Sequence, residues 1–190
     1  MQRINKIEDA PSVVREVCHK LLGYDPPSNH LDLMLSTGAV ESEFKVRKQN
    51  LLGPARGYWQ VEPATAVDIF KTFLAYGNNQ TDSGRKILKI RNAVMEYVKP
   101  NDKFWIPTTA WFSSVLSWDD ELCIALTRLI YYRRVKGAIP DVNNLPMVWK
   151  TYYNTKYGKG KVSDYVSKRE KLHIADLVKN EYKKSPYQTP

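Results

Sequence analysis

The side chain of this sequence that is best placed to do chemistry is a carboxylate at the end of an apolar helical segment. Residues 31–42 read LDLMLSTGAVES, and Glu41 follows one turn after the last small residue of one face. That face is formed by Leu31, Met34, Leu35 and Gly38. Glu43 is two positions further on, about 200° around a helix, so we expect it to point elsewhere. A carboxyl group among apolar neighbours stays protonated to higher pH and can act as a general acid. Glu41 is therefore the candidate acid, with an ordinary surface glutamate as the alternative.

A Gly-rich, aromatic stretch follows this helix. Residues 57–65 read GYWQVEPAT, which predicts a short extended segment and then a helix that begins near Pro63. Tyr58 and Trp59 can provide flat rings that stack on sugars or pack in a core. We expect one of these two rings to face Glu41.

Together these two stretches resemble a known family. The segment E-S-x-F at 41–44, followed by G-x-x-Q-x-x-P-A-T at 57–65, is similar to the signature of the soluble lytic transglycosylase domain, a relative of goose-type lysozyme. Glu41 and Gln60 are 19 positions apart, close to the family's spacing. The family's Leu-Met before the glutamine is replaced by Tyr58 and Trp59. The resemblance covers about residues 30–135 and implies an all-α, lysozyme-like fold with at most a small β-hairpin.

The resemblance also implies roles for single residues. Glu41 becomes the catalytic acid that cleaves the β-1,4 bond between N-acetylmuramic acid and N-acetylglucosamine. Gln60 becomes a hydrogen-bond partner of the sugar, Tyr58 and Trp59 stacking surfaces, and Ser42 a residue that fixes the helix end. Packing roles for these four side chains are the alternative. The glycan strands of peptidoglycan are the implied partner, and no cofactor is implied.

The second step of the reaction depends on a second carboxylate. If another carboxylate activates water, the enzyme is a hydrolytic lysozyme; if the muramyl 6-hydroxyl attacks and the same Glu acts as base, the product is a 1,6-anhydro sugar. Glu62 and Asp68 are the available second carboxylates, and Glu62 would share a face with Gln60 in an extended segment. Because the family needs one Glu alone, we favour the transglycosylase.

The predicted helix at 119–134 takes the place of a family helix whose tyrosine orients the catalytic Glu. Ala125 and Leu126 match that helix, but its Asn-Ala-Gly is absent. We favour Tyr131 over Tyr132 as the tyrosine of the cleft, and core packing of both is the alternative.

A third segment suggests a bacteriophage source. Trp149 to Gly160 reads WKTYYNTKYGKG, which resembles the C-terminal part of phage members of this family. The N-terminus lacks the apolar core of a signal peptide, and the sequence contains no 18-residue apolar run. We therefore expect no membrane insertion, and a location in the virion or in the host cytoplasm before delivery to the cell wall. Other virion proteins are further expected partners, and infection-time and late-lysis roles both stay open.

Chain length and charge limit the number of domains and the kinds of partner that the protein can have. A chain of 190 residues with 43% hydrophobic content can bury one core, so we expect a single domain over 1–182 and a flexible tail at 183–190. The net charge is +9, and residues 131–190 hold 13 Lys and Arg against 5 Asp and Glu. Basic helices over 145–182 are either a solvated surface or a surface that holds an anionic polymer. An inactive wall-binding virion protein fits this pattern, and a nucleic-acid-binding protein fits it less well.

Cysteine and histidine usage argues against a metal. Cys18 and Cys123 each lie in a predicted helix, which favours buried free thiols over a disulfide. The three histidines are scattered, so we expect no metal site. Beyond the segments above, the apolar spacing predicts further helices, over 11–22, 64–76, 83–98, 108–116, 145–157 and 163–182.

Overall fold

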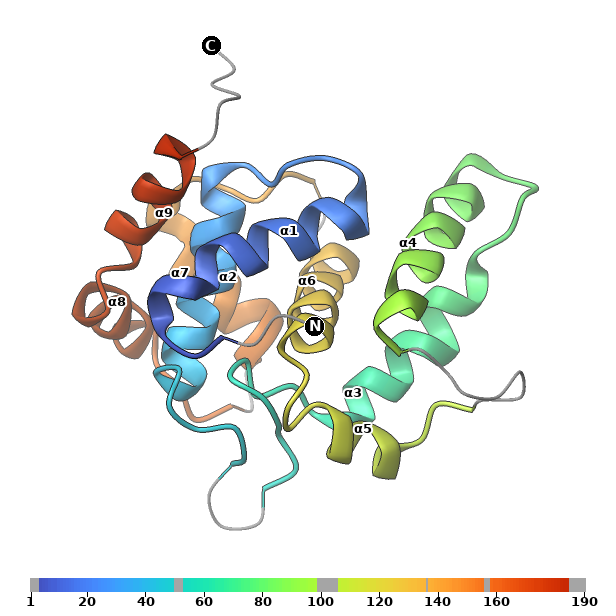
Figure 1. Cartoon of the computed structure of the whole chain (residues 1–190), viewed down its shortest axis with the longest axis horizontal. Helices are drawn as coiled ribbons and strands as arrows, with labels where there is room; N and C mark the ends of the chain where they lie inside the picture. Colours follow the sequence, from blue (N-terminus) through green and yellow to red (C-terminus); the bar gives the residue numbers. More distant parts are fainter. Residues whose placement is uncertain (1–3, 50–52, 99–105, 136, 156–157, 185–190) are drawn as a thin grey trace.

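The computed structural model describes residues 4–49, 53–98, 106–135, 137–155 and 158–184 (Figure 1). Its α-helices are α1 (Ala10–Leu22), α2 (Ser28–Ser42), α3 (Pro63–Asp68), α4 (Asp82–Val98), α5 (Thr109–Val115), α6 (Asp120–Arg134), α7 (Leu145–Val148), α8 (Val162–Lys171) and α9 (Ile174–Lys183). Short 3-10 turns η1 (Ile7–Asp9), η3 (Leu74–Tyr76) and η4 (Val142–Asn144) and π-helical segments η2 (Ile69–Phe73) and η5 (Trp149–Asn154) accompany them. The all-α prediction is confirmed. In place of a hairpin, the described part of the chain holds isolated bridges that pair Arg56 with Lys48 and with Val61.

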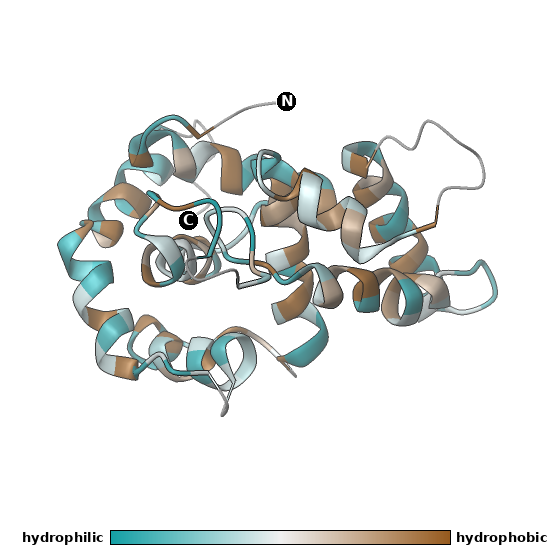
Figure 2. Ribbon diagram, turned by 90° about the horizontal axis from the view of Figure 1, so that it is seen from below, coloured by the Kyte–Doolittle hydropathy of each residue, from teal (hydrophilic) through white to brown (hydrophobic). Residues whose placement is uncertain are grey.

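Two helices, α2 and α6, form the centre of the molecule. Every residue of α2 from Leu31 to Val40 is buried, and so is every residue of α6 from Leu122 to Tyr131. Helices that are buried on all sides lie in the interior of a protein. The predicted apolar face of α2 is therefore only one part of its buried surface. Figure 1 shows α1 across α2, with α8 and α9 on one side and α3, α4 and α5 on the other. Most of these outer helices alternate between apolar and polar segments (Figure 2).

Local signals explain where most helices begin and end. Gly23 ends α1 in the left-handed conformation, with φ of 79°. The Asp119 side chain caps α6 by accepting a hydrogen bond from the N–H of Leu122 at 2.9 Å. At the start of α4 the cap is Thr81, whose hydroxyl accepts a hydrogen bond from the N–H of Gly84 at 2.9 Å.

Three predicted helices are interrupted in the structure. The helix over 64–76 changes from α to π at Ile69, and the helix over 145–157 changes at Trp149. The helix over 163–182 breaks at His173, which adopts a left-handed φ of 51°. Neither a Gly nor a Pro lies at that break. The break lets α8 pack on α2 and α7, while α9 packs on α1 and α2. Tertiary contacts therefore override the helical propensity of this segment.

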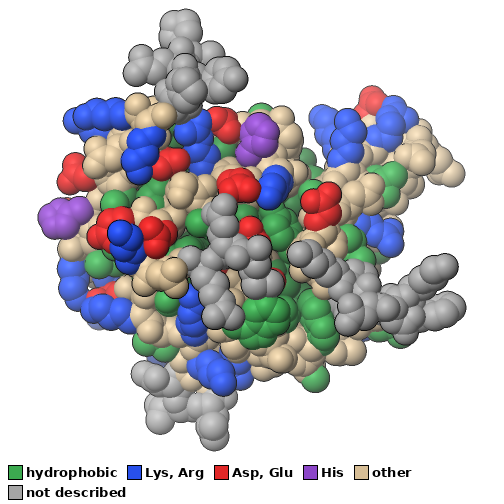
Figure 3. Space-filling model, in the orientation of Figure 1, with side chains coloured by type: hydrophobic (Ala, Val, Ile, Leu, Met, Phe, Trp, Pro, Cys, Tyr) green, Lys and Arg blue, Asp and Glu red, His purple; other side chains and the backbone are tan. Residues whose placement is uncertain are grey.

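The basic C-terminal helices use part of their charge inside the protein. Arg169 of α8 forms an ion pair with the buried Asp32 of α2, with 2.8 Å between Nε and Oδ1. Lys171 pairs with Glu43 at 2.7 Å. On the face shown in Figure 3, Lys and Arg side chains are interspersed with Asp and Glu. The charged side chains on this face are therefore mixed in sign.

The buried apolar residues form one cluster that runs from Ile4 to Val178 and includes both central helices. Cys18 and Cys123 lie in it as free thiols, as predicted. Of the expected tail at 183–190, residues 185–190 lie outside the described part of the chain. Within the described residues no helix is both long and apolar enough to cross a membrane.

Candidate active site

The candidate site is a cavity of about 1140 Å³ beside the C-terminal end of α2. Its walls come from segments far apart in the sequence: the end of α2 and the loop after it, the start of α3, the end of α6, η5 and the start of α8. Glu41, Ser42, Gln60 and Glu62, all predicted site residues, line this cavity. The structure thus brings together both halves of the sequence signature.

Glu41 occupies the last turn of α2 and contacts both the core and the cavity. Its Oε1 accepts a hydrogen bond from the indole N–H of Trp149 at 2.9 Å. Burial raises the pKa of the Glu41 carboxyl from 4.5 to about 7, while the Trp149 hydrogen bond and the positive charge of Lys168 oppose that rise. No ion pair joins Glu41 to a cation in the described part of the chain. Burial without a counter-ion is therefore the reason that this carboxyl holds a proton near neutral pH.

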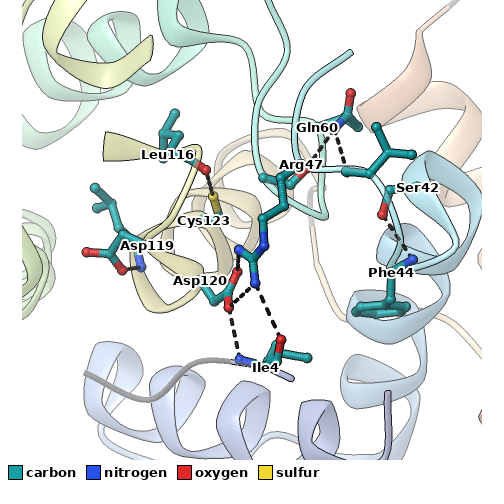
Figure 4. Close-up of polar contacts among 12 residues, drawn as sticks. Ile4, Ser42, Phe44, Arg47, Gln60, Leu116, Asp119, Asp120 and Cys123 are labelled. Carbon is teal, nitrogen blue, oxygen red and sulfur yellow. Dashed lines mark hydrogen bonds and ion pairs between the residues drawn. The ribbon is translucent and has the colours of Figure 1, made fainter. Parts of the chain in front are cut away.

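The sequence around Glu41 builds an abrupt helix end. Gly38 leaves room for the ring of Phe44, because a Cβ at position 38 would lie 2.6 Å from the Cζ atom of that ring. Glu43 and Phe44 both have positive φ and turn the chain back over α2. The Ser42 hydroxyl donates to the carbonyl of Gly38 at 3.2 Å and accepts from the N–H of Phe44 at 3.1 Å. Ser42 thus fixes the helix end, the role that the resemblance implies (Figure 4).

The Glu43 side chain has different partners from the Glu41 side chain. It forms ion pairs with Lys171 and Lys45, and these pairs hold its pKa below the usual value. Although Glu43 also lines the cavity, it is the ionised member of the two glutamates at this helix end.

Gln60 lines the cavity, but its side-chain amide nitrogen forms its hydrogen bonds within the loop. Its backbone has a positive φ of 50°. Its amide nitrogen donates to the carbonyl of Gly57 at 2.7 Å and to the carbonyl of Val46 at 3.2 Å. A side-chain amide has two N–H donors, so the amide oxygen alone remains for a sugar. Gln60 therefore supports the loop first and can contact substrate only as an acceptor.

This loop is fixed to α6 by a clamp that the sequence did not reveal (Figure 4). Arg47 pairs with the fully buried Asp120 of α6, and Asp120 also accepts the backbone N–H of Ile4 at 2.9 Å. Gly57 has φ of 71°, and a Cβ there would lie 2.3 Å from the sulfur of Cys123. Only glycine fits this close approach, which positions the stretch that carries Gln60 and Glu62.

Trp59 and Tyr58 do not provide the stacking surface that we expected. Trp59 is fully buried and donates its indole N–H to the carbonyl of Met34 at 2.7 Å. The ring of Tyr58 lies under the guanidinium of Arg47, 4.0 Å away, and packs on Phe44. Neither ring lines the cavity. The ring that faces Glu41 is that of Trp149, which corrects the expectation for Trp59 and Tyr58.

The tyrosine of the cavity is likewise neither of the two candidates on α6. Tyr131 is buried, with its hydroxyl 2.7 Å from the hydroxyl of Thr37, and Tyr132 packs on Phe73. Tyr153 of η5 lines the cavity, stacks on Tyr131 with 5.5 Å between ring centres, and donates its hydroxyl to the carbonyl of Trp59 at 2.6 Å. Tyr131 therefore acts as the packing support of Tyr153.

Trp149 and Tyr153 are site residues to which the sequence assigned no role. Both lie in the segment WKTYYN, whose π-helical turn places them on the cavity wall. The Trp149 ring also packs on Tyr165, and a Cβ at Gly160 would lie 2.6 Å from it. The W-x-x-Y-Y spacing and the later G-K-G were visible in the sequence as a signal, but nothing there linked them to Glu41.

The two candidate second carboxylates lie in different places. Glu62 is exposed at the start of α3 and lines the cavity. Asp68 lies outside the cavity lining and pairs with Arg133 at 2.8 Å, which lowers its pKa. Asp164, which the sequence did not single out, lines the cavity from α8 and accepts the N–H of Lys161. The position of Asp68 therefore excludes it as the second carboxylate of the reaction. Glu62 and Asp164 line the same cavity as Glu41.

The structure also bears on metal binding. Among the described residues, no group of three or more His, Cys, Asp or Glu side chains is arranged to hold a metal ion.

No protein-family model, no curated protein and no solved structure matches this chain.

Proposed function

We propose that this protein is a muramidase of the lysozyme-like superfamily that cleaves the β-1,4 bond between N-acetylmuramic acid and N-acetylglucosamine in peptidoglycan. One observation carries the proposal: a carboxyl group with a pKa of about 7 lies on the wall of a cavity large enough for several sugar rings. An enzyme that cleaves a glycosidic bond needs such a proton donor near neutral pH. In lysozyme, too, an apolar environment raises the pKa of the glutamate that acts as the general acid.

The Trp149 hydrogen bond favours one oxygen of Glu41 as the one that delivers the proton. Because the indole N–H can only donate, Oε1 of Glu41 must accept, and it does so at 2.9 Å. The carbonyl oxygen of a protonated carboxyl is the better acceptor, so this contact favours the proton on Oε2. Glu41 donates this proton to the glycosidic oxygen as the bond from that oxygen to C1 of the muramyl sugar breaks.

The second half of the reaction favours a transglycosylase over a hydrolase. After the first step Glu41 is ionised and can take the proton of the muramyl 6-hydroxyl while that oxygen bonds to C1. The product is a 1,6-anhydro sugar, and no water is consumed. Burial is the largest cause of the raised pKa of Glu41, and the Trp149 hydrogen bond and the charge of Lys168 oppose it. A single acid and base at this position needs no second carboxylate.

The proposed setting is a bacteriophage that delivers the enzyme to the cell wall, as a virion component or a lysis enzyme. This part rests on the likeness of the segment 149–160 to phage proteins of the family. The peptidoglycan glycan strands are the proposed partner.

Zymography on peptidoglycan tests the proposal. We expect a cleared band for the wild type and for Glu43→Gln, which changes the neighbouring ionised carboxylate, and no band for Glu41→Gln. Clearing by Glu41→Gln would refute the catalytic assignment. No clearing by the wild type would favour a wall-binding structural protein.

Mass spectrometry of the released fragments tests the transglycosylase reaction separately, because anhydro ends and reducing ends differ by one water. We expect anhydro ends, with release unchanged in Glu62→Gln and Asp164→Asn. Reducing ends that disappear in one of these two variants would show a lysozyme instead, with that residue as the base.

A further inference from the structure

The backbone at Thr155 has a conformation that is unfavourable for a residue with a side chain. Thr155 directly follows η5 and has φ of 64° and ψ of 171°, a combination that is found almost only at glycine. Because threonine is branched at Cβ, it fits a positive φ worse than most residues do. Such a conformation costs free energy and persists only where the surrounding structure imposes it. Thr155 is therefore a strained residue of the turn after η5.

Contacts on both sides of Thr155 impose this conformation. The ammonium of Lys150, within η5, donates to Oδ1 of Asn154 at 2.7 Å and to the carbonyl of Gly158 at 2.8 Å. The N–H of Gly158 donates to the carbonyl of Thr155 at 3.3 Å. A Cβ at Gly158 would lie 2.2 Å from the carbonyl oxygen of Asn154, so the two ends of the turn lie close together. Lys150 thus joins the residue before Thr155 to the segment after it.

Thr155 lines the same cavity as Glu41. Its side chain is partly buried, and its hydroxyl forms no hydrogen bond with another residue of the described part of the chain. A hydroxyl can donate one hydrogen bond and accept two. Strained backbone is often found at active sites, and Glu43 and Gln60, which also have positive φ, line this cavity too. The hydroxyl of Thr155 is therefore available to a ligand at this cavity wall.

We propose that Thr155 is a substrate-binding residue whose hydroxyl forms a hydrogen bond with an uncharged polar group of the glycan, and that the strained backbone is retained because it positions this hydroxyl. The inference rests on the proposed function and adds a residue that contacts the substrate. Two substitutions separate the parts of the proposal. Glycine relieves the strain and removes the hydroxyl, whereas valine keeps the branched shape and the strain and removes the hydroxyl alone.

Thermal unfolding tests the strain. Thr155→Gly should raise the melting temperature by about 2–4 °C, because the strain that it relieves is larger than the conformational entropy that glycine loses on folding. Thr151→Gly is the matched control. Thr151 is exposed within η5 and does not line the cavity, so glycine at this helical position should lower the melting temperature. A lower melting temperature in both variants would contradict the strain at Thr155 and overturn the proposal.

Cleavage kinetics on peptidoglycan strands test the hydroxyl. In Thr155→Val we expect kcat/KM to fall about fivefold, the effect of one neutral hydrogen bond, at an unchanged melting temperature. Thr155→Ser, which supplies a hydroxyl again, should recover most of this loss, and Thr151→Val should cleave as the wild type does. Cleavage by Thr155→Val at the wild-type kcat/KM would overturn the proposal and leave the proposed function intact. Absence of cleavage by the wild type would instead refute the proposed function, and this inference with it.

Discussion

Helix α2 carries a buried carboxylate, Asp32, and a partly buried one, Glu41, and the two have different partners. Asp32, near its start, accepts hydrogen bonds from Ser36 at 3.0 Å and from Arg169 at 2.8 Å. Glu41, near its end, accepts one from the neutral N–H of Trp149 and has no ion pair within the described residues. Asp32 therefore attaches α8 to α2 through its pair with Arg169, whereas the pKa of Glu41 is raised to about 7.

The difference shows how one helix can carry both a structural and a reactive carboxylate. A buried charge is tolerated when a partner and hydrogen bonds compensate it, and without them the group keeps its proton. Arg169 and Lys168 are adjacent on α8, but Arg169 reaches the carboxylate of Asp32 while Lys168 reaches the backbone carbonyl of Val40. The chemical roles of the two carboxylates follow from these neighbours and not from the helix itself.

The largest expected effect on stability comes from removing Asp32. Asp32→Ala leaves Arg169 without its partner, and breaking a buried pair costs about 3 kcal/mol. Denaturant unfolding should show this loss in the free energy of unfolding. Arg133→Gln, which breaks the surface pair with Asp68, should cost less than about 1 kcal/mol. Equal losses in the two variants would contradict the structural role of the Asp32 pair.

Glu41→Gln should raise stability at alkaline pH. The folded pKa of Glu41 lies above its usual value of 4.5, so the wild type is at full stability below about pH 4.5 and loses stability as pH rises through about 7. Gln does not titrate, and it still accepts the Trp149 hydrogen bond. We expect equal stability at pH 4 and an advantage of about 3 kcal/mol for the variant at pH 8.

Glu43→Gln is the matched control for that measurement. The ion pairs with Lys171 and Lys45 lower the pKa of Glu43, so they stabilise the protein above the usual pKa and are lost below it. The variant should be slightly less stable at pH 7, by less than about 1 kcal/mol, because the pairs are exposed. A stability gain for Glu43→Gln at pH 8 would refute the contrast between the two glutamates.

Trp149→Phe should change the pH profile of cleavage. It removes the N–H that lowers the pKa of Glu41, so the alkaline decline in activity should move to higher pH, and the rate should fall about tenfold as Glu41 loses its orientation. Trp59→Phe is the control, since its equally buried indole bonds to Met34 instead. Both variants should lose stability, but an alkaline decline that shifts equally in both would contradict the role of Trp149.

Much of the fold was predictable because local signals agree with the tertiary structure. Helix ends at Gly23 and Asp119 follow from residue types that favour those conformations. The break at His173 was not predictable, because its cause is the packing of α8 and α9 on different neighbours of the same core. The π-helical turn at Trp149 likewise carries no composition signal.

The site was predictable where it is contiguous in sequence. Glu41 and Ser42 were found because the helix end and the turn are encoded within a few residues. Trp149 was not assigned to Glu41, because 108 residues separate the two and only the folded chain joins them. The same limit explains why Trp59 was expected at the cavity: a nearby aromatic residue in sequence is not a nearby ring in space.

The most direct test of the proposed acid is the titration of the Glu41 carboxyl by NMR with isotope-labelled glutamate, assigned by comparison with Glu41→Gln. We predict a midpoint near pH 7 for Glu41 and a lowered midpoint for Glu43. A Glu41 midpoint close to 4.5 would contradict the proposed role, because the carboxyl would then be ionised at neutral pH and could not donate a proton.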